Sequence, residues 1–532
     1  MTEQPLFWSD QLAFGVTRKF PDRDTYVCAS GISPSGIVHA GNFREIITTD
    51  FVVKSLKNRG EDVRFIYSWD DYDRFRKVPA NVPDEFEKYI GLPLSKVPSP
   101  DEGYDSYADY FESRLEEELE DMHMDIEFIR QTEMFEKCEY ADPIKRAMNS
   151  RDEIREILNQ YRSEPLQEEW YPLRVYCEKC EKDFTEVKDY DGEYTVKYYC
   201  EECEEEDEID FSEKGLVKPP WRVDWPMRWS YEQVSFEPGG KEHSVEGGSR
   251  TTAVDIVQQI YQDEPPVYQM YEFVTKDGAK ISGSSGEDAF TISQLKEVYP
   301  PEMIRFLFSE TKPNKAFEIP FDEDIFQRYE KFDKIEDAYF NPEKMENERK
   351  RKHWKRVYEL AMVEIPDEKP LRVPFQHASF VSQTVPEEEW STKGIESLKR
   401  TGHIPEDLSE QNVERVLSRF ERAKNWAREH APEDYRYSIN FEVPDSIVSE
   451  MEESQIEAIN LLAERLKDQS FDNSDDLDKA IFDVKKESEL GTGDFFNTSY
   501  KVLLGREQGP RLSRLIMSLG QKETVKILKQ VN

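Results

Sequence analysis

The stretch DTYVCASGISPSGIVHAGN, residues 24–42, decides the fold that we predict for this chain. Its first seven residues predict a short buried strand, and Gly, Pro and Ser then mark a turn. Apolar residues recur at helical spacing from about residue 39 to residue 58, and the run VRFIYSW at residues 63–69 predicts a second strand. A strand, a helix and a strand in this order begin a doubly wound α/β sheet.

Further strands are predicted at residues 126–130, 223–229 and 267–274, and a helix is predicted at residues 142–161. From about residue 300 the pattern is helical, with no further convincing run of strands. The expected fold class is therefore α/β, a Rossmann-type domain that is followed by an all-helical C-terminal domain.

The charge and the apolar pattern exclude some classes of protein. The 532 residues include 71 Lys and Arg against 112 Asp and Glu, a net charge of −41. An acidic body repels nucleic-acid backbones, so we expect no DNA partner. We interpret the acidity as a surface adapted to a salt-rich cytoplasm, with plain solubility as the alternative. No stretch reaches the ~20 apolar residues that span a bilayer, and six cysteines are too few for a disulfide scaffold, so a cytoplasmic enzyme is expected.

Small residues and two hydrogen-bonding side chains follow the first strand. Gly31, Gly36 and Gly41 let the backbone approach a ligand closely. His39 and Asn42 would lie in the first turn of the following helix, where free N–H groups and the positive end of the helix dipole suit a phosphate. The alternative interpretation is a turn in which His39 only caps the helix.

A second motif, KDGAKISGSSG at residues 276–286, is a Gly- and Ser-rich loop with cations near its start. Such a loop can fold over a triphosphate and place the ammonium group of Lys280 where negative charge builds up. The alternative is an ordinary flexible loop.

Two CxxC pairs are separated by nineteen residues: Cys177 with Cys180, and Cys200 with Cys203. This spacing suits one tetrahedral site of four thiolates, and zinc is the expected metal in a reducing compartment. Because such a site has no open ligand position, we expect its role to be structural.

Together, the first two motifs resemble the HIGH and KMSKS motifs of the class I aminoacyl-tRNA synthetases. Asn42 replaces the second His of the first motif, and Gly283 replaces the second Lys of the loop, as in the K-x-S-G-S form of the lysine-specific branch. SWDDYD at residues 68–73, VDWP at residues 223–226 and GKEH at residues 240–243 are also similar to that branch. By this resemblance the chain is identified as a member of the class I lysyl-tRNA synthetase family over nearly its whole length.

The resemblance implies an enzyme that activates lysine with ATP and Mg²⁺ and transfers the lysyl group to its tRNA. It implies catalytic roles for His39, Asn42, Lys280 and Ser282. It places ATP against Pro34, Gly36, His39, Gly41, Asn42, Lys280, Ile281, Ser282, Gly283 and Ser284. It places lysine against Gly31, Ser33, Asp71, Asp73, Trp225 and His243. Some members of the family hold a second metal in the stretch that corresponds to residues 98–110, which contain neither Cys nor His here, so we predict one structural zinc ion.

The lysine ε-ammonium needs a carboxylate or a hydrogen-bonding cage. Asp70, Asp71 and Asp73 follow the second strand and are the first candidates, and Glu45 is a further one. A class I synthetase for another amino acid, such as glutamate, is an alternative, although an anionic substrate should bring an arginine to the pocket. A non-catalytic tRNA-binding paralogue is a second alternative, which the presence of the phosphate-handling residues disfavours.

The resemblance also divides the chain into regions. The catalytic domain is expected at residues 1–90 and 221–310, around an acceptor-end insertion at residues 91–220 whose zinc module spans about 170–215. A helical stem-contact region at residues 311–386 and an anticodon-binding domain at residues 387–532 follow. In that last domain the basic stripe of Arg415, Arg419 and Arg422 is the candidate tRNA contact, unless neighbouring glutamates pair with it.

Overall fold

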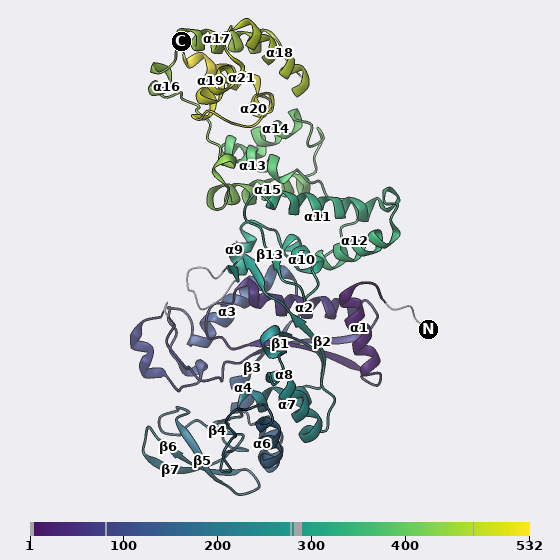
Figure 1. Ribbon diagram of the computed structural model, residues 1–532, viewed down its shortest axis with the longest axis vertical. Helices are drawn as coiled ribbons and strands as arrows, with labels where there is room; N and C mark the ends of the chain where they lie inside the picture. The colour runs from purple at the N-terminus through teal and green to yellow at the C-terminus, as the bar shows by residue number, and fades with distance from the viewer. Residues whose placement is uncertain (1–4, 80–81, 277–278, 281–289, 472, 532) are drawn as a thin grey trace. The chain divides into compact units, whose positions relative to one another are not determined.

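The computed structural model describes residues 5–79, 82–276, 279–280, 290–471 and 473–531, and for residues 279–280 it describes only the backbone. The chain divides into two compact units (Figure 1). The first consists of Met1–Lys296, Pro301–Ile319 and Glu348–Glu364, and the second consists of Glu297–Pro300, Pro320–Asn347 and Ile365–Asn532.

A five-stranded parallel sheet forms the centre of the first unit, with the strand order β10-β9-β1-β2-β3. The helix α2 (Ala40–Lys57) connects β1 (Thr25–Ile32) to β2 (Asp62–Trp69), which confirms the predicted strand, helix and strand. The third predicted strand is β3 (Glu127–Arg130). The strand order reverses beside β1, and open α/β sheets bind ligands at the carboxyl ends of the strands at such a point.

Helices cover both faces of this sheet (Figure 1). The helices α1 (Trp8–Lys19) and α2 lie on one face, and α7 (Trp221–Tyr231) and α8 (Ser249–Ile256) lie on the other. The fully buried Arg305 of α10 (Pro301–Glu310) pairs with Asp50 of α2 and donates a hydrogen bond to the carbonyl oxygen of Leu360 at 3.1 Å. This side chain therefore fixes α2 and α10 to α12 (Glu348–Ala361).

The strand predicted at residues 223–229 is wrong, because these residues lie in α7, which begins directly after Pro220. A short apolar run does not distinguish a buried strand from a buried helix. The strand beside β1 is instead β9 (Val234–Gly240), and β10 (Val267–Tyr271) covers most of the last predicted strand. The single helix predicted at residues 142–161 is two helices, α5 (Ala141–Asn149) and α6 (Arg151–Asn159), with Ser150 between them.

Two inserted segments and one small sheet complete the first unit. The helix α3 (Tyr107–Leu119) lies between β2 and β3. The pair β4 (Arg174–Val175) and β8 (Val217–Lys218) flanks an antiparallel sheet of β5 (Thr185–Tyr190), β6 (Thr195–Cys200) and β7 (Glu205–Asp210). A fourth sheet joins β11 (Val274–Lys276) to β12 (Ala279–Lys280) and β13 (Phe317–Glu318). The helix α9 (Ile292–Lys296) follows the second sequence motif.

The second unit is helical, as the pattern beyond residue 300 predicts. Its longer helices are α11 (Ile325–Phe340), α13 (Phe375–Thr384), α15 (Glu410–Glu429), α17 (Glu453–Asp468), α18 (Ser474–Glu487), α19 (Thr492–Leu504), α20 (Leu512–Leu519) and α21 (Gln521–Leu528). Among the described residues, no helix combines the length and the apolar character that crossing a membrane requires.

Candidate functional site

The first motif forms the start of α2, where His39 and Asn42 cap the helix. The Nδ1 atom of His39 accepts hydrogen bonds from the backbone N–H groups of Gly41 (3.0 Å) and Asn42 (3.3 Å), and Asn42 Oδ1 accepts one from the His39 N–H (3.3 Å). The N–H of Ala40 donates to the carbonyl oxygen of Phe290 at 2.7 Å. The expectation that these N–H groups are free to bind a phosphate is therefore wrong. The helix dipole and the side chains of this turn are what remains to attract a phosphate. Pro34 and Gly36 lie in the loop before this turn.

The cap also settles the hydrogen position on the His39 ring. Because Nδ1 accepts two N–H groups, the neutral imidazole carries its hydrogen on Nε2. His39 is buried, with 8% of its surface exposed. The imidazole thus combines a structural acceptor on one nitrogen with a donor on the other.

The segments on both sides of the second motif lie against α2. Phe290, which follows the motif, bonds to Ala40 as described, and the Arg44 guanidinium donates to the carbonyl oxygen of Phe273 at 3.4 Å, just before β11. The backbone of Lys280 pairs with β11 in the β11–β12 hairpin. Phe273 and Phe290, which flank the second motif, therefore both contact the first two turns of α2. Outside the described residues lie Ile281, Ser282, Gly283 and Ser284.

A cavity lies between α7 and the strands β1, β2 and β9, where the strand order reverses. Its lining includes Ser30, Gly31, Asp70, Trp225, Trp229 and Glu237. A Cβ atom at Gly31 would lie 2.6 Å from the carbonyl oxygen of Ser68, so β1 and β2 approach closely here only because position 31 has no side chain. The ring of His243 lies 5.9 Å from that of Trp225. The structure thus brings Gly31, Trp225 and His243 to one place.

Five charged side chains form a buried series of ion pairs beside the cavity. Arg228 pairs with Asp70 (2.8 Å) and Asp224 (3.1 Å). Lys218 pairs with Asp224 (3.3 Å) and Asp73 (3.3 Å). The side chain of Asp224 is completely buried, and those of Lys218 and Arg228 are 9% exposed. The carboxylates of Asp70 and Asp73 are thus already matched by cations of the protein itself.

Ser33 and Asp71 have protein partners as well. The Ser33 hydroxyl donates to Asp73 at 2.7 Å. The Asp71 carboxylate accepts a hydrogen bond from the backbone N–H of Thr132 at 2.8 Å, and burial raises the pKa of Asp71 to about 6. The three aspartates lie at the expected strand end, but contacts within the protein satisfy each of them.

Glu45, on the second turn of α2, is a half-buried carboxylate with only neutral hydrogen-bond donors. It accepts from the Ser30 hydroxyl (3.0 Å), the Gly31 N–H (3.2 Å) and the Tyr271 hydroxyl (2.6 Å). Burial raises the pKa of this carboxyl, and no Lys or Arg of the described chain forms an ion pair with it. A carboxylate in this state is suited to receive a cation from outside the protein.

Glu237 on β9 is a functional candidate that the sequence analysis missed. Its carboxylate accepts hydrogen bonds from the indole N–H of Trp225 (3.0 and 3.1 Å) and from that of Trp229. Burial raises the pKa of Glu237 to about 7, and the nearby Glu45 charge acts in the same direction. Trp221 stacks on Trp225 with ring centroids 5.1 Å apart. The sequence signal for Glu237 is a lone charge inside the strand VSFEPGG, residues 234–240.

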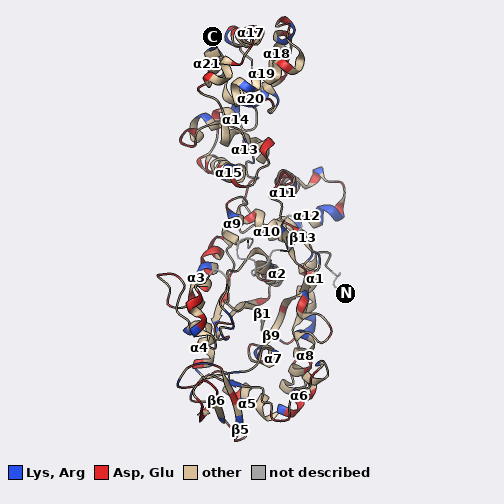
Figure 2. Ribbon diagram, turned by 60° about the vertical axis from the view of Figure 1, so that its left-hand side comes forward, with Lys and Arg blue, Asp and Glu red and all other residues tan. Residues whose placement is uncertain are grey.

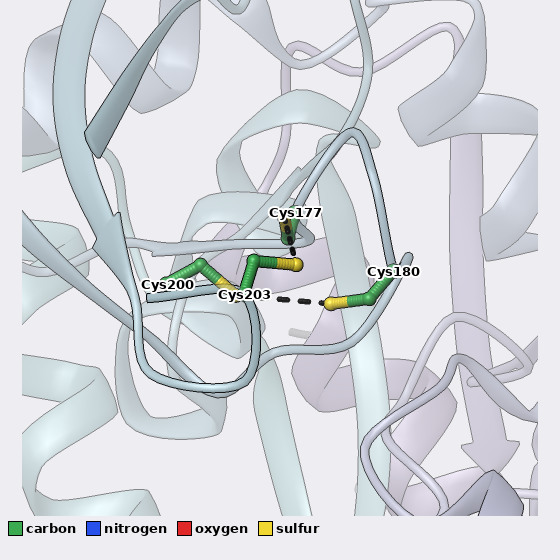
Figure 3. A group of neighbouring side chains, drawn as sticks. All are labelled: Cys177, Cys180, Cys200 and Cys203. Carbon is green, nitrogen blue, oxygen red and sulfur yellow. Dashed lines mark hydrogen bonds between the residues drawn. The ribbon is translucent and has the colours of Figure 1, made fainter. Parts of the chain in front are cut away.

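The four cysteines of the CxxC pairs converge in the inserted antiparallel module (Figure 3). The Sγ atoms of Cys177 and Cys203 are 3.8 Å apart, and those of Cys180 and Cys200 are 3.7 Å apart. Zinc with four tetrahedral thiolates at about 2.3 Å requires sulfurs about 3.8 Å apart. All four Sγ atoms lie within 4.8 Å of one another, so this cluster fits a zinc ion.

The basic stripe lies on α15 in the second unit. Arg419 is 8% exposed and pairs with Asp333 at 3.1 Å. Arg422 donates a hydrogen bond to the carbonyl oxygen of Ser418 at 3.1 Å. The Arg415 guanidinium donates to a side-chain amide oxygen one helical turn earlier at 3.4 Å. The structure therefore keeps the Arg419 guanidinium inside the unit instead of presenting it as part of an exposed stripe.

Comparison with known proteins relates the whole chain to one family. Residues 6–364 match the model of the family described as tRNA synthetases class I (K), and residues 421–531 match the model of an anticodon binding domain. The chain is 40% identical to the lysine–tRNA ligase of Pyrococcus horikoshii, with 98% of this chain and 99% of that protein covered. It is 39% identical to the lysine–tRNA ligase of Borreliella burgdorferi, with coverages of 96% and 97%. It is 35% identical to that of Methanocaldococcus jannaschii, with coverages of 97% and 98%.

We expect Lys218→Met to destabilise the first unit, because it leaves the buried carboxylates of Asp73 and Asp224 without one of their cations. Breaking a buried ion pair costs about 3 kcal/mol or more. The control is Lys241→Met, since Lys241 pairs with Glu272 while 52% exposed, and losing an exposed pair costs about 0.5 kcal/mol. Thermal unfolding of both variants measures the difference, and equal midpoints would contradict the role given to the buried series.

Proposed function

The chain belongs to the class I (K) tRNA synthetases, and we propose that it activates lysine with ATP and joins it to a tRNA. In the first step a lysine carboxylate oxygen bonds to the α-phosphorus of ATP, and the bond to the bridging oxygen breaks to release pyrophosphate. In the second step a 3′-terminal ribose hydroxyl attacks the lysyl carbonyl carbon, loses its proton and displaces AMP. Mg²⁺ accompanies the triphosphate.

The observation that supports lysine is the state of the charges at the cavity. Glu237 lines the cavity and is buried, and the half-buried Glu45 bonds to Ser30 and Gly31 of the lining. Both carboxylates accept hydrogen bonds only from neutral donors, whereas the cavity's arginine, Arg228, is already paired with Asp70 and Asp224. A site in this state favours a cationic amino acid over glutamate.

Amino-acid-dependent exchange of pyrophosphate into ATP tests this function. We expect exchange with lysine and none with the other standard amino acids. Exchange with glutamate instead of lysine would show that the protein is a synthetase for glutamate. The absence of exchange with any amino acid would favour a non-catalytic tRNA-binding paralogue.

His39 is proposed to donate a hydrogen bond from Nε2 to the α-phosphate while its Nδ1 holds the helix cap. Asn42 supports that turn, and Lys280 and Ser282 are assigned to the outer phosphates as the second motif closes. The support for these roles is the sequence pattern and the contact that joins Ala40 to Phe290 at 2.7 Å.

The two roles of His39 are separable by substitution. His39→Asn keeps a good capping side chain and removes the Nε2 donor, so adenylate formation should fall about 10²–10³-fold with an unchanged unfolding midpoint. His39→Ala should show the same fall in the rate of adenylate formation, and its free energy of unfolding should also fall by about 1 kcal/mol. Burst measurements of adenylate formation and thermal unfolding check both statements. If His39→Asn formed adenylate at the wild-type rate, the proposed hydrogen bond from the imidazole to the α-phosphate would be wrong.

Glu45 is proposed to bind an ammonium group of lysine, with Gly31, Ser33, Trp225 and His243 around the substrate. Stacked and tilted indoles suit the aliphatic stem, and Glu237 keeps Trp225 and Trp229 in orientation.

Glu45→Gln should raise KM for lysine about 10–100-fold with a smaller change in kcat, because a charged hydrogen bond is worth about 1.5–3 kcal/mol. Asp71→Asn is the matched variant, since Asp71 is bonded to the protein backbone, and its KM should stay near the wild-type value. Steady-state kinetics in lysine separates them. A raised KM for Asp71→Asn with an unchanged KM for Glu45→Gln would instead assign the binding of the lysine ammonium group to Asp71.

The cysteine cluster is proposed to hold one structural zinc ion, which the sulfur spacing of 3.7–3.8 Å supports. Elemental analysis of the purified chain should find one zinc per chain. Cys200→Ser should lower that value, whereas Cys138→Ser, outside the cluster, should not. Two equivalents per wild-type chain would contradict the proposal.

We propose that the helical residues 387–532 read the anticodon, that the insertion at residues 91–220 meets the acceptor end, and that residues 311–386 contact the stem of the tRNA. The reaction is placed in the cytoplasm, where reducing conditions keep thiolates available as zinc ligands.

A further inference from the structure

We propose that Arg44 is a positioning residue for the activation step, because it holds the hairpin that carries Lys280 against α2, the helix that begins at His39. The inference rests on the proposed function, in which Lys280 and His39 bind the phosphates of one ATP molecule. Arg44 lies in the second turn of α2, and 2% of its surface is exposed. Its partners come from two segments that lie more than 200 residues later in the chain.

The Arg44 guanidinium donates hydrogen bonds to three backbone carbonyl groups. One belongs to Phe273, directly before β11, at 3.4 Å. The other two belong to Lys312 (3.1 Å) and Lys315 (2.7 Å), in the segment that leads from α10 to β13. The guanidinium also lies over the ring of Phe317 in β13, 4.8 Å from the ring centroid. One side chain of α2 therefore binds the starts of β11 and β13 together.

These two strands support the hairpin of the second motif. β11 pairs with β13 on one side and with β12 on the other, where Thr275 lies opposite Lys280. The N–H of Glu272 donates to the carbonyl oxygen of Pro313 at 2.9 Å, which joins the two segments that Arg44 binds. Figures 1 and 2 both show α10 and β13 lying close to α2. A shift of this small sheet relative to α2 would therefore move the backbone of Lys280.

The charge of Arg44 is used differently from that of the other buried arginines. Among the described residues the buried arginines are Arg44, Arg228, Arg305 and Arg419, and the last three each form an ion pair with an aspartate. Arg44 instead has backbone carbonyl groups and an aromatic ring as its partners. Burial lowers the pKa of its guanidinium to about 10. A buried cation without a carboxylate partner is costly, so its presence here requires a reason beyond stability.

The geometry of the guanidinium supplies that reason. Its planar group presents several N–H donors in fixed directions, so it can set the distance between separate segments in a way that an apolar side chain cannot. In the proposed reaction His39 and Lys280 have to contact the same ATP while charge builds up on the phosphates. A misplacement of about 1 Å can lower the rate of such a step about 10²-fold. The competing interpretation is that Arg44 acts through its charge on the neighbouring Glu45, and therefore on lysine.

The first test uses R44K in the full chain. Lysine keeps the charge but has no planar fork to hold the two segments together, so adenylate formation should fall about 10–100-fold. The KM for lysine should stay near the wild-type value, because Arg44 does not line the cavity. The matched control is R305K, since Arg305 is buried and also donates to two backbone carbonyl groups, those of Leu360 (3.1 Å) and Met122 (3.4 Å). It should lower the unfolding midpoint and leave the rate unchanged.

A double-mutant cycle with K280A distinguishes positioning from a general structural loss. If Arg44 acts by placing Lys280, then R44K should lower the rate of adenylate formation less than about twofold in the K280A background. A purely structural role would give the full effect in both backgrounds. F317L removes the ring beneath the guanidinium with a small change in volume and should lower the rate about threefold, again only when Lys280 is present. If R44K does not fold, the same cycle with F317L decides.

The outcomes separate this inference from the proposed function. Absence of lysine-dependent pyrophosphate exchange in the wild type would defeat the proposed function and the inference with it. Exchange in the wild type together with a wild-type rate for R44K would overturn the inference alone, as would effects of R44K and K280A that add independently. A raised KM for lysine with an unchanged kcat in R44K would also overturn it and assign the role of Arg44 to the charge on Glu45.

Discussion

A charge that is buried away from water needs a partner, and this requirement organises the site between α7 and the strands β1 and β9. Asp70, Asp73 and Asp224 share two cations, so the protein satisfies them itself. Glu45 and Glu237 accept hydrogen bonds only from hydroxyl, amide and indole donors. The site is therefore ordered by contacts within the protein, and Glu45 and Glu237 are the carboxylates there that accept only from neutral donors, which favours a cationic substrate.

The start of α2 shows how one side chain serves both the fold and the site. The imidazole of His39 closes the first turn through Nδ1, and the same bonds place the ring hydrogen on Nε2. The backbone N–H groups of this turn are occupied, so a phosphate here would depend on side chains and on the helix dipole. The contact between Ala40 and Phe290 connects the turn to a residue that follows the second motif, 250 residues later in the chain.

The charge of the chain is unevenly distributed, and this matters for a protein whose substrate includes RNA. An excess of 41 negative charges opposes association with nucleic acid in general. Contact then has to be confined to places where cations are concentrated on a rigid support. On α15, Arg419 serves the second unit itself, because it pairs with Asp333.

Sequence alone determined the features that depend on local order: the strand, helix and strand of residues 24–69, the helical second half, and a cysteine spacing that allows four sulfurs to meet. It also identified the two motifs and the family that they resemble. It misjudged residues 223–229, because a buried apolar run looks alike in a helix and in a strand. Only the tertiary structure decided which carboxylates are satisfied, since Asp70 and its partner Arg228 are 158 residues apart. Glu237, likewise, became a candidate only when α7 placed two indoles over it. The pairing of a buried charge depends on distance in space, and no local pattern along the chain records that distance.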